Sequence, residues 1–348
     1  AKDLRDLKMR LGNIFIGYTL SKKPVYARDL NVAGAMATLL KYAIMPNLVQ
    51  TIEGNPAIIH GGPFANIAQG TNSVIGTLMG MTYSDYTVTE AGFGFDLGAE
   101  KFFDIKCQSA NISPKAVVLT TTIRALKYHG GSDLKALDIP NTDTLRQGLP
   151  NLEKHLENIK QFGVTPIIAI NKFKTDSEEE IKLIENFAKF KNVRIAVADV
   201  WAKGGEGALK LAHHVIEVAE ACKTKFKPLY KWNMDIETKI ETIAQKIYGA
   251  EHVDYNSKAK LQLKRIKELG LDNLPICVAK TQKSLSDNPK LLGRPKDFVV
   301  TIREIEIAAG AGFLIPITGD IMRMPGLPAH PASEGINISD SGEISGLF

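Results

Sequence analysis

A tryptophan stands where an apolar strand pattern meets a glycine-rich turn. Residues 199–212 read DVWAKGGEGALKLA, follow the strand-like run VRIAVA and end in a helical pattern. Trp201 is one of the two tryptophans of the chain. A large rigid ring at this place either closes the end of a hydrophobic core or forms a flat wall for a flat ligand.

A second aromatic residue, Phe173, follows the neighbouring strand pattern TPIIAIN. In an open α/β sheet, ligands bind beyond the carboxyl ends of the strands. Phe173 and Trp201 could therefore face each other across a gap and enclose a planar heterocycle, at about 1–3 kcal/mol per stacked face. Core packing explains the same spacing, so both interpretations stay open at this point.

The segment TEAGFGFDLG places a carboxylate and two glycines after a further strand pattern. Glu90 could orient a substrate, hold a metal through water, or pair with a basic side chain. Gly92 and Gly94 allow sharp turning and close approach of backbone to a ligand. Asp96 could instead cap a helix that starts at Leu97.

Other strand ends carry isolated polar residues. His60 has no second metal ligand nearby in the sequence, which favours a structural hydrogen bond. Arg124 could meet phosphate or carboxylate, or pair with a surface acid. Gly204 and Gly205 could bind an anion where a helix opens, although a tight turn needs glycine anyway. We predict no metal site in this sequence.

Two nucleotide-binding patterns are incomplete. The letters NK after PIIAI resemble the base-reading NKxD element of P-loop nucleotidases, but Asp176 lies too far along the chain for that spacing. The phosphate-binding pattern G-x-x-x-x-G-K-[ST] does not occur in the 348 residues. A GTPase-like switch is therefore a weaker hypothesis.

Composition narrows the class of protein. A chain of 348 residues with 44% hydrophobic and 23% charged residues is long enough for two or three globular domains. Three cysteines without CxxC spacing favour neither zinc nor disulfides, as in a reducing cytoplasm. We predict no membrane segment and no nucleic-acid partner. The net charge of +5 suits a small anionic ligand, and a solvated mixed surface explains it as well.

Strand and helix patterns alternate from about residue 46 to residue 200 and predict a doubly wound, mostly parallel α/β sheet. The predicted strands are residues 47–54, 86–92, 116–122, 165–171 and 194–200. Helices are predicted around Leu152, Leu156, Ile159 and Phe162, before Gly163, and after a cap at Thr175, Asp176 or Ser177.

The alternation of strand and helix patterns ends after residue 222. Two amphipathic helices end at Gly249 and Gly270, a strand covers residues 275–281, and residues 298–321 read as an antiparallel hairpin. The alternation slips between Ile302 and Ile305, which predicts a bulge. We therefore predict a C-terminal α+β domain. The predicted domains are residues 1–150, 151–225 and 226–348.

The first residues are already helical, with Leu4, Leu7, Leu11 and Ile14 on one face. No capping residue precedes the letters AKD, so we expect a chain that begins partway through a longer protein.

Long motifs of this chain, taken together, resemble formate–tetrahydrofolate ligase. They are PNLVQTIEGNPAIIHGGPFANIAQGTNS, VTEAGFGFDLGAEKFFDIKC, TTIRALKYHGG, GLPNLEKHLENIK, DVWAKGGEGA, KIETIAQKIYGA, NLPICVAKTQKSLSDNPKLLGRP, GDIMRMPGLP and the terminal GLF. They cover nearly the whole chain in the family's order. The N-terminal portion of the family, with its Walker-type phosphate loop, is missing from the match, so the P-loop nucleotidase type of sheet that the resemblance implies would be incomplete.

The resemblance implies a ligase that joins formate to tetrahydrofolate with MgATP through formyl phosphate. Phe173 and Trp201 would hold the pterin ring, with Val197 lining the same pocket, so Trp201 is interpreted as a ligand wall. The group Glu90, Gly92, Phe93 and Gly94 would lie beside the formyl phosphate, and His60, Arg124, Gly204 and Gly205 are further phosphate- or substrate-adjacent candidates. The resemblance also implies a monovalent cation (K⁺ or NH₄⁺), a cytoplasmic location and a homotetramer.

The sequence departs from the family's usual pattern at several positions. Phe95 replaces a small residue beside Gly94 and could narrow the phosphate channel, and Lys174 replaces a proline that many bacterial members have. The other departures are Gln69, Thr71, Thr120 and Thr121. Without the phosphate loop we expect the chain alone to be inactive. The alternative is a non-catalytic fragment that binds folate or a nucleotide.

Overall fold

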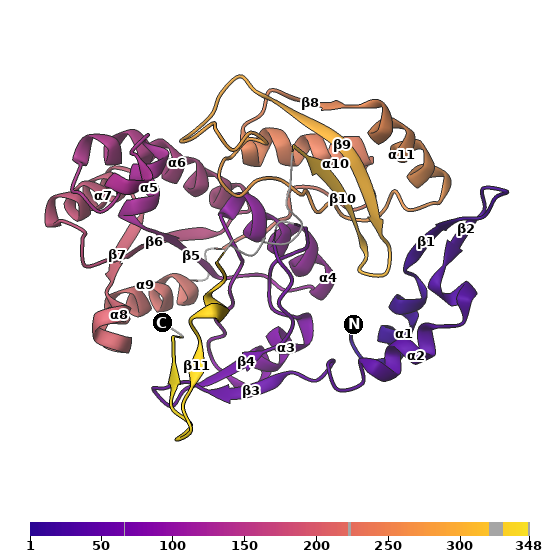
Figure 1. The fold of residues 1–348 in the computed structure, drawn as a ribbon. Coiled ribbons are helices and arrows are strands. Elements are labelled where there is room, and N and C mark those ends of the chain that lie inside the picture. Colours follow the sequence, from indigo (N-terminus) through magenta and orange to yellow (C-terminus); the bar gives the residue numbers. More distant parts are fainter. Residues whose placement is uncertain (66, 222–223, 320–329, 347–348) are drawn as a thin grey trace.

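A three-stranded parallel sheet lies at the centre of the α/β part of the molecule (Figure 1). The computed structural model describes residues 1–65, 67–221, 224–319 and 330–346. The strands β5 (Ala116–Thr121), β6 (Thr165–Asn171) and β7 (Arg194–Ala198) pair in the order β5-β6-β7. Their apolar runs suit strands that are covered on both faces.

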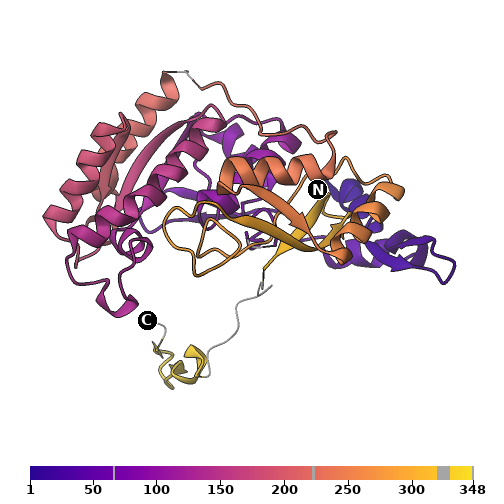
Figure 2. The same ribbon diagram turned by 90° about the horizontal axis from the view of Figure 1, so that it is seen from above.

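Helices cover both faces of this sheet (Figure 2). Helices α6 (Thr142–Gln161) and α7 (Glu178–Phe190) pack on one face, and α9 (Leu209–Glu220) packs on the other. The predicted stripe on α6 is buried, with Leu152 and Leu156 in one core cluster with β6. Helix α5 (Ile123–His129) packs against α6. The α/β class is confirmed.

Local capping signals are also confirmed. Ser177 caps α7 and forms a capping box with Glu180. A further cap, which was not predicted, is Asn141: its side chain accepts hydrogen bonds from two backbone N–H groups at the start of α6. Gly163 follows α6 with a φ of +72°, a left-handed conformation that favours glycine.

Two of the five predicted parallel strands are wrong. Strand β3 (Asn47–Gln50) pairs with β4 (Pro56–Ile59) in an antiparallel hairpin, because a turn closes it on the adjacent segment. Residues 86–92 form only one isolated bridge, between Thr71 and Ala91. The sheet is therefore smaller than predicted, and its three parallel strands do not establish a P-loop type of fold.

A buried segment joins the α/β part to the C-terminal part. It consists of two π-helical stretches, η2 (Phe95–Ala99) and η3 (Phe102–Cys107). The short helix α4 (Gln108–Ala110) follows them and is not buried. The ring of Phe103 stacks on that of Phe162 at the end of α6, with ring centroids 4.6 Å apart. The same cluster includes residues of the C-terminal helices and strands, so one core spans both parts.

The C-terminal part is a mixed sheet with two helical segments. Strands β9 (Val299–Ala308) and β10 (Phe313–Thr318) form the predicted antiparallel hairpin, and β8 (His252–Tyr255) pairs with β9 in parallel. The predicted bulge is confirmed, because the pairing passes from Glu304 to Ile302. Residues 320 and 321 lie outside the described residues. One helical segment is α10 (Ile236–Ile243), which continues directly into η6 (Ala244–Tyr248). The other is α11 (Ser257–Glu268). Residues 275–281 make isolated bridges to β10 rather than a strand.

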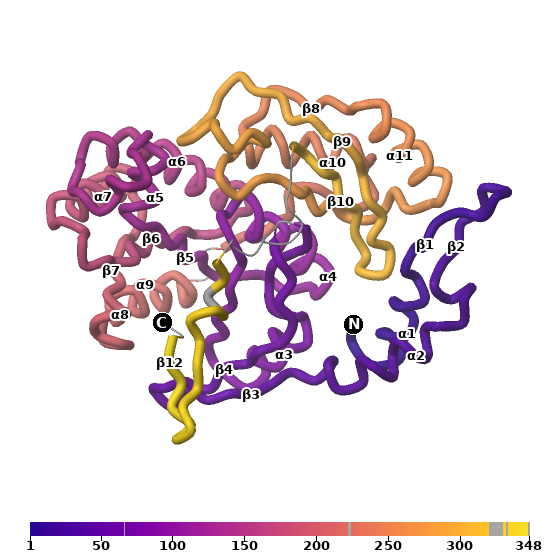
Figure 3. The backbone as a smooth tube through the Cα atoms, viewed as in Figure 1, coloured from indigo at the N-terminus to yellow at the C-terminus, as the bar shows by residue number. Residues whose placement is uncertain are grey.

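The N-terminal residues form a small arm at one side of the molecule (Figure 3). Its elements are α1 (Leu4–Gly12), β1 (Phe15–Tyr18), β2 (Pro24–Tyr26), η1 (Ala27–Leu30) and α2 (Ala33–Leu39). Asp3 caps α1, because its carboxylate accepts a 2.7 Å hydrogen bond from the N–H of Asp6. The expected uncapped start is therefore wrong.

The remaining short elements are α3 (Val74–Tyr83), η4 (Leu134–Ala136), α8 (Val200–Lys203), η5 (Gly204–Ala208), η7 (Ala332–Glu334), β11 (Asn337–Ile338) and β12 (Ile344–Ser345). The predicted domain boundary at residue 150 lies inside α6, and β5 pairs with β6 across it. The first two predicted domains therefore share one sheet.

Candidate functional site

The two candidate ring-binding residues follow neighbouring, hydrogen-bonded strands. The last pair between β6 and β7 is Asn171 with Ala198. Phe173 comes two residues after the first, and Trp201 lies in α8, three residues after the second. The side chains are exposed, Phe173 by 44% and Trp201 by 74%. Neither ring is therefore part of a core, which excludes the core-packing interpretation.

A lysine side chain covers the Trp201 ring. The ammonium nitrogen of Lys174 lies 4.2 Å from the centroid of that ring. Cations are attracted to the face of an indole by its quadrupole. The sequence marked Lys174 as a departure from the family pattern, but spacing alone did not predict this contact.

A cavity of about 490 Å³ opens beside these loops, between α7 and the end of β7. Val197 lines it, whereas Phe173 and Trp201 do not. The other lining residues are Lys172, Glu178, Ile181, Lys182, Glu185, Asp199, Lys203, Glu206 and Gly207. Lysines and carboxylates are mixed in this wall. The cavity therefore has no strong preference for an anion.

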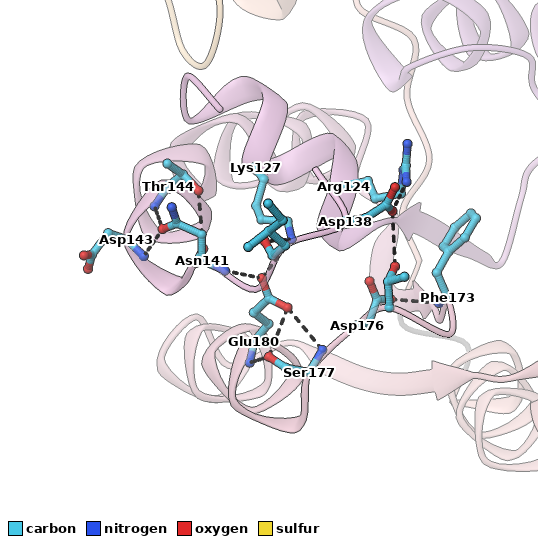
Figure 4. A network of polar contacts seen from close by, with 12 residues as sticks. Arg124, Lys127, Asp138, Asn141, Asp143, Thr144, Phe173, Asp176, Ser177 and Glu180 are labelled. Carbon is cyan, nitrogen blue, oxygen red and sulfur yellow. Dashed lines mark hydrogen bonds and ion pairs between the residues drawn. The ribbon is translucent and has the colours of Figure 1, made fainter. Parts of the chain in front are cut away.

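A network of polar contacts fixes the loop that carries Phe173 (Figure 4). Glu180 is fully buried and forms an ion pair of 3.0 Å with the buried Lys127. Its Oε1 also accepts the backbone N–H of Asn141 at 2.9 Å, and its Oε2 accepts the N–H of Ser177 at 3.1 Å. The Glu180 carboxylate therefore joins the starts of α6 and α7.

Arg124 belongs to the same region but has a partner of its own. Its guanidinium forms an ion pair with Asp138, which also accepts a 3.3 Å hydrogen bond from the Thr175 hydroxyl. Asp176 accepts the backbone N–H of Phe173 at 2.8 Å, and the Phe173 ring projects away from it (Figure 4). Arg124 is therefore placed to hold the loop, and a ligand anion would have to compete with Asp138.

The glycine turn after α8 binds a carboxylate of the protein itself. The backbone N–H of Gly205 donates a 2.6 Å hydrogen bond to Oε1 of Glu53, at the tip of the β3–β4 hairpin. Gly204 has a φ of +56°, and a Cβ there would lie 2.5 Å from the same oxygen. The turn thus receives an anion as the sequence suggested, but that anion is internal. Sequence reasoning missed Glu53.

The segment Glu90 to Gly94 lies in a loop before η2. Glu90 is exposed, and Phe93 is 51% exposed with a φ of +60°. A left-handed conformation is unfavourable for a bulky residue, and such strain is found preferentially at functional sites. The Gly92 N–H donates to the carbonyl of Gly70 at 2.9 Å. Among the described residues, no hydrogen bond, ion pair or ring contact joins this segment to Phe173 or Trp201.

Gly94 has a structural reason to be glycine. A Cβ at this position would lie 2.5 Å from Oδ1 of Asp96. Asp96 is not a helix cap but forms a buried ion pair of 2.7 Å with Lys280. Burial would raise the pKa of Asp96, but the charges of Lys280 and His155 outweigh it, so its pKa is lowered. Asp96 is therefore ionised beside Lys280.

Phe95, which replaces a small residue of the family pattern, belongs to the hydrophobic core. Its ring is buried in the core, with centroids 5.7 Å from Phe103 and 5.9 Å from Phe162. The expected narrowing beside Gly94 is therefore wrong, because the larger ring fills core space.

His60 has protein partners at both ring nitrogens. Its Nε2 lies 2.9 Å from the carbonyl of Ala43, which requires an N–H at Nε2. In the neutral ring Nδ1 then accepts from the Ser73 hydroxyl at 2.7 Å. Among the described residues, no group of three or more His, Cys, Asp or Glu could hold a metal ion. None of the described helices is long and apolar enough to cross a membrane.

The protein is thus of the α/β class, with exposed aromatic side chains at the carboxyl edge of a parallel sheet. The model of the formate–tetrahydrofolate ligase family matches residues 1–348, and the chain belongs to this family. The family's activity is the ligation of formate to tetrahydrofolate, with ATP as the further substrate. The protein is thus a ligase of one-carbon metabolism.

Proposed function

We propose that the chain binds the pterin ring of tetrahydrofolate between Phe173 and Trp201. Val197, which the family resemblance assigns to the same pocket, lines the adjoining cavity. The observation that carries this proposal is the pair of exposed aromatic rings after adjacent strands β6 and β7. Stacking on such rings contributes about 1–3 kcal/mol per face. The adjoining cavity is lined by both lysines and carboxylates, which suit the neutral edge of a ring that donates and accepts hydrogen bonds.

The proposed reaction has two steps. A formate oxygen attacks the γ-phosphorus of ATP, giving formyl phosphate and ADP. The amine of tetrahydrofolate then attacks the formyl carbon, phosphate leaves, and 10-formyltetrahydrofolate forms. Glu90 and Phe93 are exposed and could contact formyl phosphate, and the backbone at Gly92 and Gly94 would lie beside it.

The remaining substrate-adjacent candidates need a ligand to displace an existing partner. Arg124 would have to leave Asp138, and the turn at Gly204 and Gly205 would have to release Glu53. His60 is bonded at both ring nitrogens. We keep these four as secondary candidates for contact with substrate phosphate.

Further parts of the proposal come from the family resemblance: Mg²⁺ with ATP, a monovalent cation (K⁺ or NH₄⁺), a homotetramer and a cytoplasmic location. No suitable cluster of ligating side chains lies among the described residues, so we assign no step to an ion.

A GTPase-like switch built on the letters NKFKTD is a weaker alternative. Asp176, the acid that would read a base, accepts the backbone N–H of Phe173 within its own turn. Lys172 pairs with Glu178 at 3.3 Å. A non-catalytic fragment that binds folate shares the same aromatic site and differs in turnover alone.

Binding calorimetry with tetrahydrofolate tests the proposed site. Phe173→Ala and Trp201→Ala should each weaken binding by about 1–3 kcal/mol, the scale of one stacked face. Phe190→Ala is the matched control, because that ring is 82% exposed at the far end of α7. Equal affinity in wild type and both site variants would refute the ring site.

A coupled assay of the 348-residue chain with formate, MgATP and tetrahydrofolate tests the finer proposal that it has no turnover alone. The sequence contains no G-x-x-x-x-G-K-[ST] loop, and phosphoryl transfer depends on positioned, neutralised phosphates. ATP-dependent formation of 10-formyltetrahydrofolate would contradict this proposal and exclude the non-catalytic alternative.

A further inference from the structure

The contact between Lys174 and Trp201 bears on how a ring could enter the proposed site. The ammonium lies 4.2 Å from the ring centroid, which is within the range of a cation held over an aromatic face. Lys174 follows Phe173 directly in the β6–α7 loop. Its ammonium therefore reaches Trp201 from the loop that carries the other candidate ring.

The Lys174 ammonium has no acidic partner among the described residues. Within the described part of the chain, no carboxylate lies at ion-pair distance from Lys174, whereas its neighbour Lys172 pairs with Glu178 at 3.3 Å. Lys174 and Trp201 are exposed, so water can replace the contact when the lysine moves. The indole ring is then the main partner that holds the Lys174 ammonium.

We propose that Lys174 sets the affinity of the site as an internal competitor. In the ligand-free protein its ammonium covers a face of Trp201, and it must leave before a planar, uncharged heterocycle can stack there. This inference rests on the proposed ring site. Lys174 is a positioning residue in this scheme: it acts through the Trp201 ring and takes no part in bond making.

The strengths of the two interactions set the expected effect. A cation over an exposed ring contributes less binding free energy than a stacked heterocycle does. The ligand therefore displaces the Lys174 ammonium from Trp201, but it binds less tightly than it would without this competition. Removing the charge should therefore tighten binding of tetrahydrofolate about two- to fivefold, the equivalent of an exposed cation–π contact.

Calorimetry with tetrahydrofolate on three variants tests this. Lys174→Met should bind about two- to fivefold more tightly than wild type, and Lys174→Arg should not, because guanidinium also stacks on indole. Lys41→Met is the matched control, since Lys41 lies 5.1 Å from the Tyr42 ring centroid in the N-terminal arm. Unchanged or weaker binding by Lys174→Met would overturn the proposal, and weaker binding would mean that the ammonium contacts the ligand.

A second measurement needs no ligand. Acrylamide should quench the fluorescence of Lys174→Met more than that of wild type or Lys174→Arg, because one face of Trp201 becomes free. The other tryptophan, Trp232, is half-buried and donates its N–H to the Asp104 carbonyl at 2.9 Å, so its contribution stays constant. Equal quenching would overturn the proposal. If wild type fails to bind tetrahydrofolate, the ring site itself fails, while the quenching still reports on the contact.

Discussion

Glu53 and Gly205 are joined by a 2.6 Å hydrogen bond from the glycine N–H to the glutamate carboxylate, across 152 residues of sequence. The bond ties the β3–β4 hairpin to the turn that follows Trp201. A carboxylate is a strong acceptor for backbone N–H groups. The turn is therefore ordered by a segment that is remote in the sequence.

Replacing Glu53 should loosen the turn that carries Trp201. We expect Glu53→Ala to weaken binding of tetrahydrofolate, whereas Glu53→Gln should keep most of the affinity because its amide oxygen still accepts from Gly205. Calorimetry on both variants measures the difference. If Glu53→Ala binds as tightly as wild type, the hydrogen bond does not order the site.

Gly94→Ala should destabilise the protein. The new Cβ would lie 2.5 Å from the ion-paired Asp96 carboxylate, which cannot move without disturbing Lys280. Overpacking of this kind costs about 1–3 kcal/mol. Thermal unfolding should show a lowered Tm, with Gly62→Ala as the control, because a Cβ at Gly62 meets nothing within 4 Å. An unchanged Tm would instead assign Gly94 to ligand approach alone.

The buried Lys127–Glu180 pair should contribute much more than the exposed Lys172–Glu178 pair. Removing one partner of a buried pair leaves an unpaired charge and costs about 3–5 kcal/mol. An exposed pair is worth about 0–1 kcal/mol. Denaturant unfolding of Glu180→Gln and Glu178→Gln compares them directly. Similar losses for both variants would show that the buried network does not hold the two helix starts.

Two buried acids, Glu100 and Asp104, should make a contribution to the free energy of unfolding that decreases as pH rises. Burial raises the pKa of Glu100 well above its ordinary value and that of Asp104 to about 7. They are four residues apart in the buried segment, and both Glu100 oxygens and Oδ2 of Asp104 lack a hydrogen-bond partner. We expect a proton shared between the two carboxyl groups, which would give one oxygen of each a hydrogen-bond partner.

The sign follows from the raised pKa values. In the unfolded chain, carboxyl groups release their protons near pH 4. In the folded protein, Asp104 keeps its proton up to about pH 7. The folded state therefore binds more protons between these limits, and the free energy of unfolding decreases by up to about 1.4 kcal/mol per pH unit for each proton.

Glu100→Gln should flatten this pH dependence, because its amide can donate to Asp104 in place of the shared proton. Urea unfolding at several pH values measures the slope, with Asp340→Asn as an exposed control. Burial lowers the pKa of His129 to about 4 and also that of His155, and these two groups make the free energy of unfolding rise with pH in the same range. The decisive quantity is therefore the difference between the two slopes: equal pH dependence in wild type and Glu100→Gln would contradict the assignment of a shared proton.

Sequence patterns predicted the parts of the fold that depend on local chemistry. The stripe on α6, the cap at Ser177 and the left-handed Gly163 are set by residues a few positions apart, and all three were confirmed. The parallel strands predicted at residues 47–54 and 86–92 were wrong, because an apolar run does not specify which segment it pairs with.

The same limit applies to the site. The placement of Phe173 and Trp201 after two neighbouring strands followed from strand order, which the alternation of strands and helices predicts. The partners of Gly205 and Asp96 lie 152 and 184 residues away, so no spacing rule could have found Glu53 or Lys280. The position of the Lys174 ammonium over Trp201 depends on a side-chain conformation that a sequence pattern does not specify.

A crystal structure of the protein with tetrahydrofolate bound tests the central proposal most directly. We predict the pterin ring between Phe173 and Trp201, with the Lys174 ammonium moved off the indole face it covers in the ligand-free protein. A pterin ring bound elsewhere, with Lys174 still over Trp201, would contradict the proposed site.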